Sequence, residues 1–129
     1  MITKVTEGRR KKIFPLMFLL LIFLLIGPLP AKNFYFPQVR IEIFINEDGS
    51  FRVEEARTYD FEGAFSWASL WIPLRVSRQG YSYSIQIKNF QVTDEQGQPL
   101  PVEKKISGDR FEAKWFYQAA NERRTFHFS

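Results

Sequence analysis

The sequence predicts an all-β fold, an immunoglobulin-like antiparallel β-sandwich preceded by an N-terminal hydrophobic leader helix. Three observations support this prediction. An unbroken apolar run fills residues 13–26 behind a basic cluster. Most later segments alternate apolar and polar residues with the period of a strand, and turn sequences rich in Gly, Asn, Asp and Ser separate them. Short strands with no amphipathic helix between them favour two stacked sheets.

The leader has a basic start, an apolar middle and a helix-breaking end. Residues 1–12 carry five basic side chains against Glu7, and Gly27-Pro28-Leu29-Pro30-Ala31 closes the apolar run. A basic cluster is retained on the cytoplasmic side, so residues 1–31 are expected to be a signal peptide or an N-terminal membrane anchor. Ala31 suits cleavage and Leu29 does not, while the run is shorter than the roughly 20 residues of a straight span, which favours cleavage. We therefore expect residues 32–129 on the extracytoplasmic side of the cell membrane.

Charge and cysteine content exclude several classes of function. The chain has 18 basic and 14 acidic residues, but residues 32–129 carry 13 of each, so the basic excess belongs to the leader. A nucleic-acid partner is therefore not expected, because phosphate binding needs a basic surface. The absence of cysteine excludes disulfides, thiol nucleophiles, thiolate metal sites and N-terminal lipidation. No cofactor is predicted.

Strands are predicted in sequence order along the exported part. Residues 39–45 alternate, Asn46-Glu47-Asp48-Gly49 supplies a turn, and residues 51–59 return, which predicts a hairpin with one buried face. Residues 81–88 show the clearest alternation and predict a half-buried strand continuing to Val92. Turns at 94–99 and 107–109 precede strands at 110–117 and 123–128. The sequence stops within the last of these, so we expect the domain, residues 32–129, to be truncated at its C-terminal end.

The order of these segments resembles the YciQ-like predicted membrane proteins, which share a domain of unknown function. The resemblance rests on Ile41-Glu42-Ile43, the turn and strand from Asn46 to Glu55, Tyr59-Asp60-Phe61-Glu62-Gly63, Trp71-Ile72-Pro73-Leu74 and the late strands around Trp115 and Arg123. It implies more of the sandwich and transmembrane helices beyond Ser129. The family has no established activity, so the resemblance implies a topology and no reaction.

The sequence supports no catalytic or metal-binding arrangement, because the side chains either point in the wrong directions or lack partner residues. Glu54 and Glu55 are adjacent in a strand, so their side chains point to opposite faces and cannot act as an acid/base pair. His127 is the single histidine and is expected to face solvent from a strand, which leaves a hydrolytic triad or zinc site without partners. Asn46 and Asp48 match only the opening of a calcium loop, and a plain turn is preferred. We therefore predict that the chain is not an enzyme.

The best candidates for ligand binding are the aromatic residues Phe65, Trp67 and Trp71. They lie in an irregular stretch, residues 61–74, that is interpreted as a strand end and a packed loop. Exposed tryptophans stack on sugar rings or lie at a lipid interface, whereas buried ones supply core packing. We expect core packing for Trp71 and leave Trp67 open between the two roles.

Together these features predict a membrane-associated extracytoplasmic domain that is a non-enzymatic interaction module. Its expected partners are the membrane and a cell-envelope protein or glycan. The alternative is a glycan or cell-wall binding module. A second alternative is part of a hydrolase that missing sequence would complete.

Overall fold

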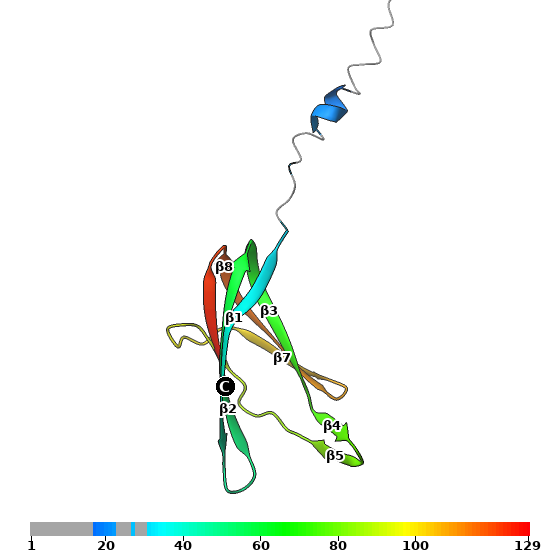
Figure 1. Ribbon diagram of the computed structural model, residues 1–129, viewed down its shortest axis with the longest axis vertical. Coiled ribbons are helices and arrows are strands. Elements are labelled where there is room, and N and C mark those ends of the chain that lie inside the picture. Colours follow the sequence, from blue (N-terminus) through cyan, green and yellow to red (C-terminus); the bar gives the residue numbers. More distant parts are fainter. Residues whose placement is uncertain (1–16, 23–26, 28–30) are drawn as a thin grey trace, which may run out of the picture. The chain divides into compact units, whose positions relative to one another are not determined.

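The structure is a computed structural model that describes residues 17–22, 27 and 31–129 (Figure 1). The chain divides into two units, residues 1–30 and residues 31–129. In the first, residues 17–22 are helical and exposed. Apart from Gly27 and Ala31, the remainder of the predicted leader, including its basic cluster, lies outside the described residues. Within the described part, no helix has the length and apolar character needed to cross a membrane.

The second unit consists of antiparallel strands. Their bounds are β1 (Asn33–Ile45), β2 (Phe51–Glu62), β3 (Ala64–Pro73), β4 (Arg75–Arg78), β5 (Tyr81–Ser84), β6 (Val92–Thr93), β7 (Val102–Ser107), β8 (Arg110–Ala120) and β9 (Arg123–Phe128). One sheet has the order β1-β2-β9-β6, a second has the order β3-β8-β7, and β4 and β5 form a separate hairpin. The predicted all-β class is confirmed.

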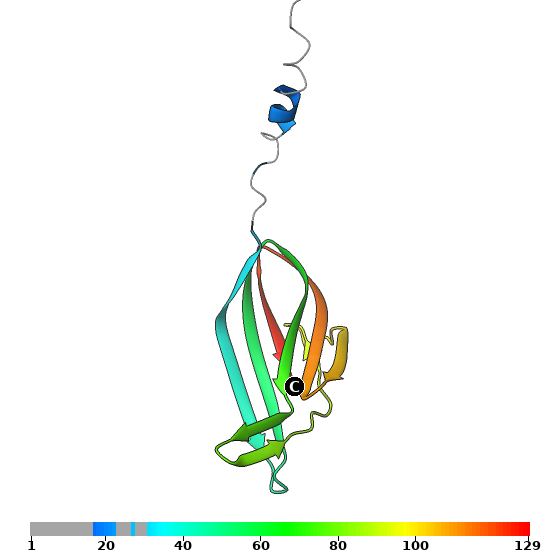
Figure 2. The ribbon, with the colours of Figure 1, turned by 90° about the vertical axis from the view of Figure 1, so that its right-hand side faces the viewer.

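The two larger sheets form two layers (Figures 1 and 2). They come together at the connection between β2 and β3, where Gly63 has a φ of +96° that favours glycine. From this end the layers diverge toward the β1–β2 turn and the β4–β5 hairpin, as Figure 1 shows. The layers are therefore closely packed at one end and apart at the other.

The core lies between β8 on one sheet and β2 and β9 on the other. Every second residue of β8 from Phe111 to Ala119 is buried. Trp115 of β8 and Phe126 of β9 are both fully buried. The Trp115 and Phe126 rings pack with centroids 6.0 Å apart. Burying an aromatic side chain removes about 150–250 Å² from water, so this cluster supplies most of the stabilisation in a domain without disulfides. The predicted strands at 110–117 and 123–128 are confirmed.

The predicted hairpin at residues 39–59 is also confirmed, but its predicted burial is wrong. Ile43 of β1 pairs with Val53 of β2, and Gly49 in the turn has a φ of +83°. However, the alternating apolar residues of β1 are 47% exposed at Val39 and 81% exposed at Ile45. They share the inner face of the sheet, yet the second sheet does not reach over them.

Two other predictions are corrected. Residues 61–74 were predicted to be a strand end and a packed loop; the strand end is the end of β2, but the packed loop is strand β3, because the chain reverses at Gly63 and then pairs with β8. The predicted half-buried strand from 81 to Val92 is only the short, exposed β5, which pairs with β4 alone, and residues 85–91 form no strand. Tyr81 is 81% exposed, because no other layer covers this two-stranded hairpin.

Candidate binding site

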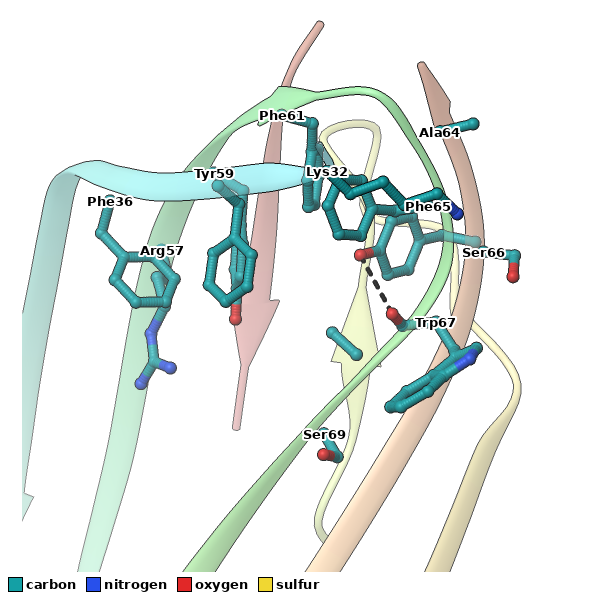
Figure 3. Close-up of a pocket in the computed structure, with 13 residues that line it drawn as sticks. Lys32, Phe36, Arg57, Tyr59, Phe61, Ala64, Phe65, Ser66, Trp67 and Ser69 are labelled. Atoms are coloured by element: carbon teal, nitrogen blue, oxygen red, sulfur yellow. Dashed lines mark hydrogen bonds between the residues drawn. The ribbon is translucent and has the colours of Figure 1, made fainter. Parts of the chain in front are cut away.

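A cavity of about 470 Å³ lies between the edge strands of the two large sheets. Its wall is formed by the start of β1, the end of β2 and the first half of β3, with one residue from β8 (Figure 3). The lining residues are Lys32, Phe34, Phe36, Arg57, Tyr59, Phe61, Ala64, Phe65, Ser66, Trp67, Ala68, Ser69 and Tyr117. The lining of the cavity is therefore predominantly aromatic. The cavity lies at the side of the domain where β1 and β3 are the edge strands of their sheets.

Its aromatic side chains divide into a buried base and an exposed rim. Tyr59 and Phe61 are buried and stack with centroids 5.3 Å apart. Phe36 contacts Tyr59 edge to face at 4.6 Å, and Phe34 meets Phe65 of β3 at 6.0 Å. Nearly half of the Phe34 and Phe36 surface remains in water. A ligand that covers this rim would gain apolar burial at about 25 cal/mol per Å².

The polar groups of the cavity are cationic or neutral. The Arg57 guanidinium lies 5.3 Å from the Phe36 ring and bonds Oε1 of Glu55 at 2.6 Å. Burial alone lowers the pKa of Arg57, but the bond to Glu55 and nearby charges raise it overall, so the side chain is protonated. The Lys32 amino group lies 5.8 Å from the Phe65 ring and forms no ion pair with any residue that the structure describes. Lys32 is thus the cation available to a ligand.

Tyr117 closes the inner end of the cavity as a neutral phenol. Burial raises the pKa of its hydroxyl to about 12. The hydroxyl donates a hydrogen bond of 3.3 Å to the carbonyl oxygen of Trp67, which Figure 3 shows as a dashed line. None of the side chains that line the cavity is a carboxylate. The lining therefore supplies no anionic group that would pair with Lys32.

The structure separates the three predicted site residues. Phe65 points into the cavity and packs against Phe61 at 4.8 Å. A register shift between Phe65 and Trp67 then turns Trp67 to the outer face, where it borders the cavity and is 51% exposed. Trp71 lies further along β3, outside the cavity and 57% exposed. The expectation of core packing for Trp71 is wrong, because Leu70 and Ile72 take the inward positions of β3.

Both tryptophans contact cations on the outer face of β8. The Lys114 amino group lies 4.5 Å from the Trp67 ring, and the Arg110 guanidinium lies 4.6 Å from the Trp71 ring. Such contacts are worth about 0.5–1 kcal/mol at exposed sites. Trp67 and Trp71 therefore belong to an aromatic and cationic row on the outside of the sheet.

Sequence reasoning missed Lys32, Phe34, Phe36 and Arg57. The alternation of Phe34 and Phe36 precedes Pro37, where the β1–β2 register shifts by a bulge. The shift keeps these two phenylalanines on the same face as Val39 although the spacing from 36 to 39 is odd. A search that allowed one irregularity at Pro37 would have extended the strand back to residue 33.

The sites rejected from the sequence are arranged as the alternation predicted. Glu55 bonds Arg57 on the inner face, whereas Glu54 lies 3.2 Å from Arg52 on the outer face. His127 is exposed between buried Phe126 and Phe128, as expected for a strand histidine facing solvent. Within residues 17–22, 27 and 31–129, no group of three or more potential ligands is placed to hold a metal ion.

Comparison of the chain with protein-family models, with curated proteins and with solved structures found no match.

Proposed function

We propose that this chain is a membrane-associated protein whose extracytoplasmic domain is a non-enzymatic interaction module. The leader pattern supports export, since a basic segment followed by an apolar run directs the rest of the chain across the membrane. The resemblance to the YciQ-like membrane proteins supports association with the cell membrane. Two packed antiparallel sheets of four and three strands support the finer assignment of an immunoglobulin-like sandwich.

The observation that carries the proposal is the uncovered apolar face of β1. From Phe34 to Ile45 the inward-facing side chains are 44% to 81% exposed. These side chains are Phe34, Phe36, Val39, Ile41, Ile43 and Ile45, and the name "open face" is used for them below. Large contiguous apolar surfaces on soluble domains mark sites of interaction. A catalytic role has no comparable support, because the cavity beside this face is lined by no nucleophile paired with a base.

Export is tested with a reporter enzyme that becomes active only outside the cytoplasm, fused after Phe128. The expected result is activity that depends on the leader. Leu21→Arg with Leu24→Arg should abolish it, because each charge at the centre of the run costs about 2.5–3.5 kcal/mol on insertion. Leu21→Ala with Leu24→Ala is the matched control and should retain it. A reporter that stays in the cytoplasm with the native leader contradicts the proposal.

A glycan or cell-wall binding module is the second candidate, favoured by the exposure of Trp67 and Trp71 on one face. It is the weaker candidate because Lys114 and Arg110 already lie against these rings and compete with a sugar for them. Titration of intrinsic tryptophan fluorescence with wall polysaccharide separates the two. Saturable quenching of tryptophan fluorescence that is lost in Trp67→Ala and kept in Tyr81→Ala would favour the glycan-binding module over the interaction module.

A further inference from the structure

We propose that the domain binds an extended polypeptide segment, which adds as a strand to the free edge of β3 and covers the open face of β1. The proposal rests on the proposed function, because it names the partner class of the same interaction surface. It draws on three properties of the molecule: unequal sheets, an unprotected strand edge and an unmatched positive charge.

The first property is that the two layers differ by one strand. Four strands form the sheet that contains β1, whereas the opposite sheet has three and ends at β3. Figure 2 shows β1 and β2 continuing past the end of β3, with only the β4–β5 hairpin crossing in front of their far ends. β1 touches the opposite layer near Phe34 and Phe65, and its apolar residues from Val39 onward are exposed. A fourth strand beside β3 would make the layers equal and cover those residues.

The second property is the edge of β3 itself. Among the described residues β3 pairs only with β8, so the main-chain groups on its other side have no strand partner over ten residues. Edge strands are normally protected by charged side chains or internal prolines. The β3 sequence Ala-Phe-Ser-Trp-Ala-Ser-Leu-Trp-Ile-Pro has no charged residue, and its proline is the last position. N–H and C=O groups at a free strand edge can pair with the main chain of an added segment, and an acyl chain has no such groups to offer.

The third property defines the side chains of the partner. Every second residue of the added strand would face the open face, so apolar residues are required at that spacing. Directly before β1, Lys32 has no ion pair within the described residues, whereas Arg57 is paired with Glu55. An acidic residue at the corresponding end of the segment would neutralise Lys32. The partner is thus an extended segment with alternating apolar residues and a carboxylate at one end.

Strand β3 or β1 of a second copy of the chain fits this description less well. Its own β3 is uncharged and would bring no carboxylate to Lys32. Its β1 has one acidic residue, Glu42, which points to the outer face and is paired with Arg40. Self-association is therefore an outcome that the experiment must detect.

The test measures hydrogen exchange of the β3 amides in the full chain held in lipid nanodiscs. The probe is a short synthetic peptide in which Val and Thr alternate and Asp ends the sequence. A peptide of the same composition in scrambled order is the control. We expect the probe to slow exchange by at least about tenfold at alternate amides of Ala64–Pro73, because only a paired strand protects every second residue. Equal protection by the scrambled peptide, or none by the probe, would overturn the proposal.

Matched variants locate the contact. Val39→Lys and Ile41→Lys alter exposed residues of the open face and should weaken probe binding by at least about tenfold without changing the melting temperature. Ile106→Lys makes the same kind of change at an exposed residue of β7 and should leave binding unchanged. Lys32→Glu should favour a probe ending in Lys over one ending in Asp. Binding that is indifferent to Val39→Lys and Ile41→Lys would contradict the assigned surface.

Two further results would show that a second copy of the chain or a lipid, instead of a peptide, covers the open face. Sedimentation of the native chain as a dimer with β3 already protected would overturn the proposal in favour of a second copy. Competition by a fatty acid that leaves the β3 amides unprotected would overturn it in favour of a lipid. An exported reporter together with unprotected β3 amides rejects this inference alone, whereas a cytoplasmic reporter rejects the proposed function itself.

Discussion

Strands β8 and β1 have the same alternating pattern and opposite environments. In β8, Phe111, Ala113, Trp115, Tyr117 and Ala119 alternate with polar or partly exposed residues and are all buried. In β1, the alternating apolar residues from Val39 to Ile45 are all exposed. The period of two identifies the residues that share a face, but it does not show whether another layer covers that face.

The position of each strand in its sheet explains the difference. β8 lies between β3 and β7 and faces β2 and β9 across the core. β1 lies at the edge of its sheet and pairs with β2 alone. The sheets also diverge along β1, as Figure 1 shows. Burial is thus decided by the non-local arrangement of strands.

The largest expected effect is the loss of a tryptophan on the covered side. Trp115→Ala should lower the free energy of unfolding by about 3–5 kcal/mol, because Trp115 is fully buried and its loss leaves a cavity. Trp71→Ala, the matched control on the outer face, should cost less than about 1 kcal/mol, the value of its contact with Arg110. Urea unfolding measures both. Similar losses for the two variants would contradict the assignment of inner and outer faces.

A smaller effect is expected in the turn that joins β1 to β2. Gly49 has a φ of +83°, and no atom beyond its two chain neighbours lies within 4 Å of the position that a Cβ would occupy. Gly49→Val should therefore cost about 1–3 kcal/mol through backbone strain alone. Gly49→Asn is the control and should cost less, because asparagine tolerates positive φ. Equal melting temperatures for Gly49→Val and the native chain would show that the turn is not held in this conformation.

An acid-sensitive ion pair is expected between Glu95, in the turn that follows β6, and Arg124 of β9. Burial alone raises the pKa of Glu95, but hydrogen bonds from Arg124 and from backbone N–H groups outweigh it and lower the pKa. Because the folded-state pKa is below the unfolded value of 4.5, the pair stabilises the fold above that pH, and the stabilisation is lost as the pH falls through the folded-state pKa.

Glu95→Gln should therefore reduce stability by about 1 kcal/mol or less at neutral pH, and the difference from the native chain should disappear in acid. Glu54→Gln is the matched change on the β1–β2 hairpin, where both partners of the Arg52 pair are largely exposed. It should have no measurable effect at either pH. Thermal unfolding between neutral and acidic pH measures both variants, and a constant difference for Glu95→Gln would contradict the lowered pKa.

Local pattern predicted much of this fold. Alternation located β1, β2, β8 and β9, and glycine with polar residues located the turns at Gly49, Gly97 and Gly108. The same rule failed at Tyr81 and Tyr83, whose hairpin has no layer over it. It also failed for β3, where the register shift after Phe65 disrupts the period.

The candidate site was predicted only in part. Phe65 and Trp67 were identified because aromatic residues cluster in that segment. Lys32, Phe34 and Phe36 were missed because their role depends on contact with β3, which is distant in sequence. Pairing between strands that are distant in the chain has no local signal, so neither the cavity nor the open face could be located from alternation.

The most direct test of the account is the accessibility of the open face in the native chain. The protein has no cysteine, so a single introduced thiol reports on one position. Ile43→Cys on β1 and Ala113→Cys on β8 place a thiol on the inner face of each sheet, and maleimide labelling of the folded full chain measures its exposure. The account predicts that Ile43→Cys reacts as fast as a thiol in the unfolded chain and that Ala113→Cys reacts slower by at least about a hundredfold, because labelling there requires unfolding. Equal protection of both thiols would show that the face of β1 is covered and would contradict the account.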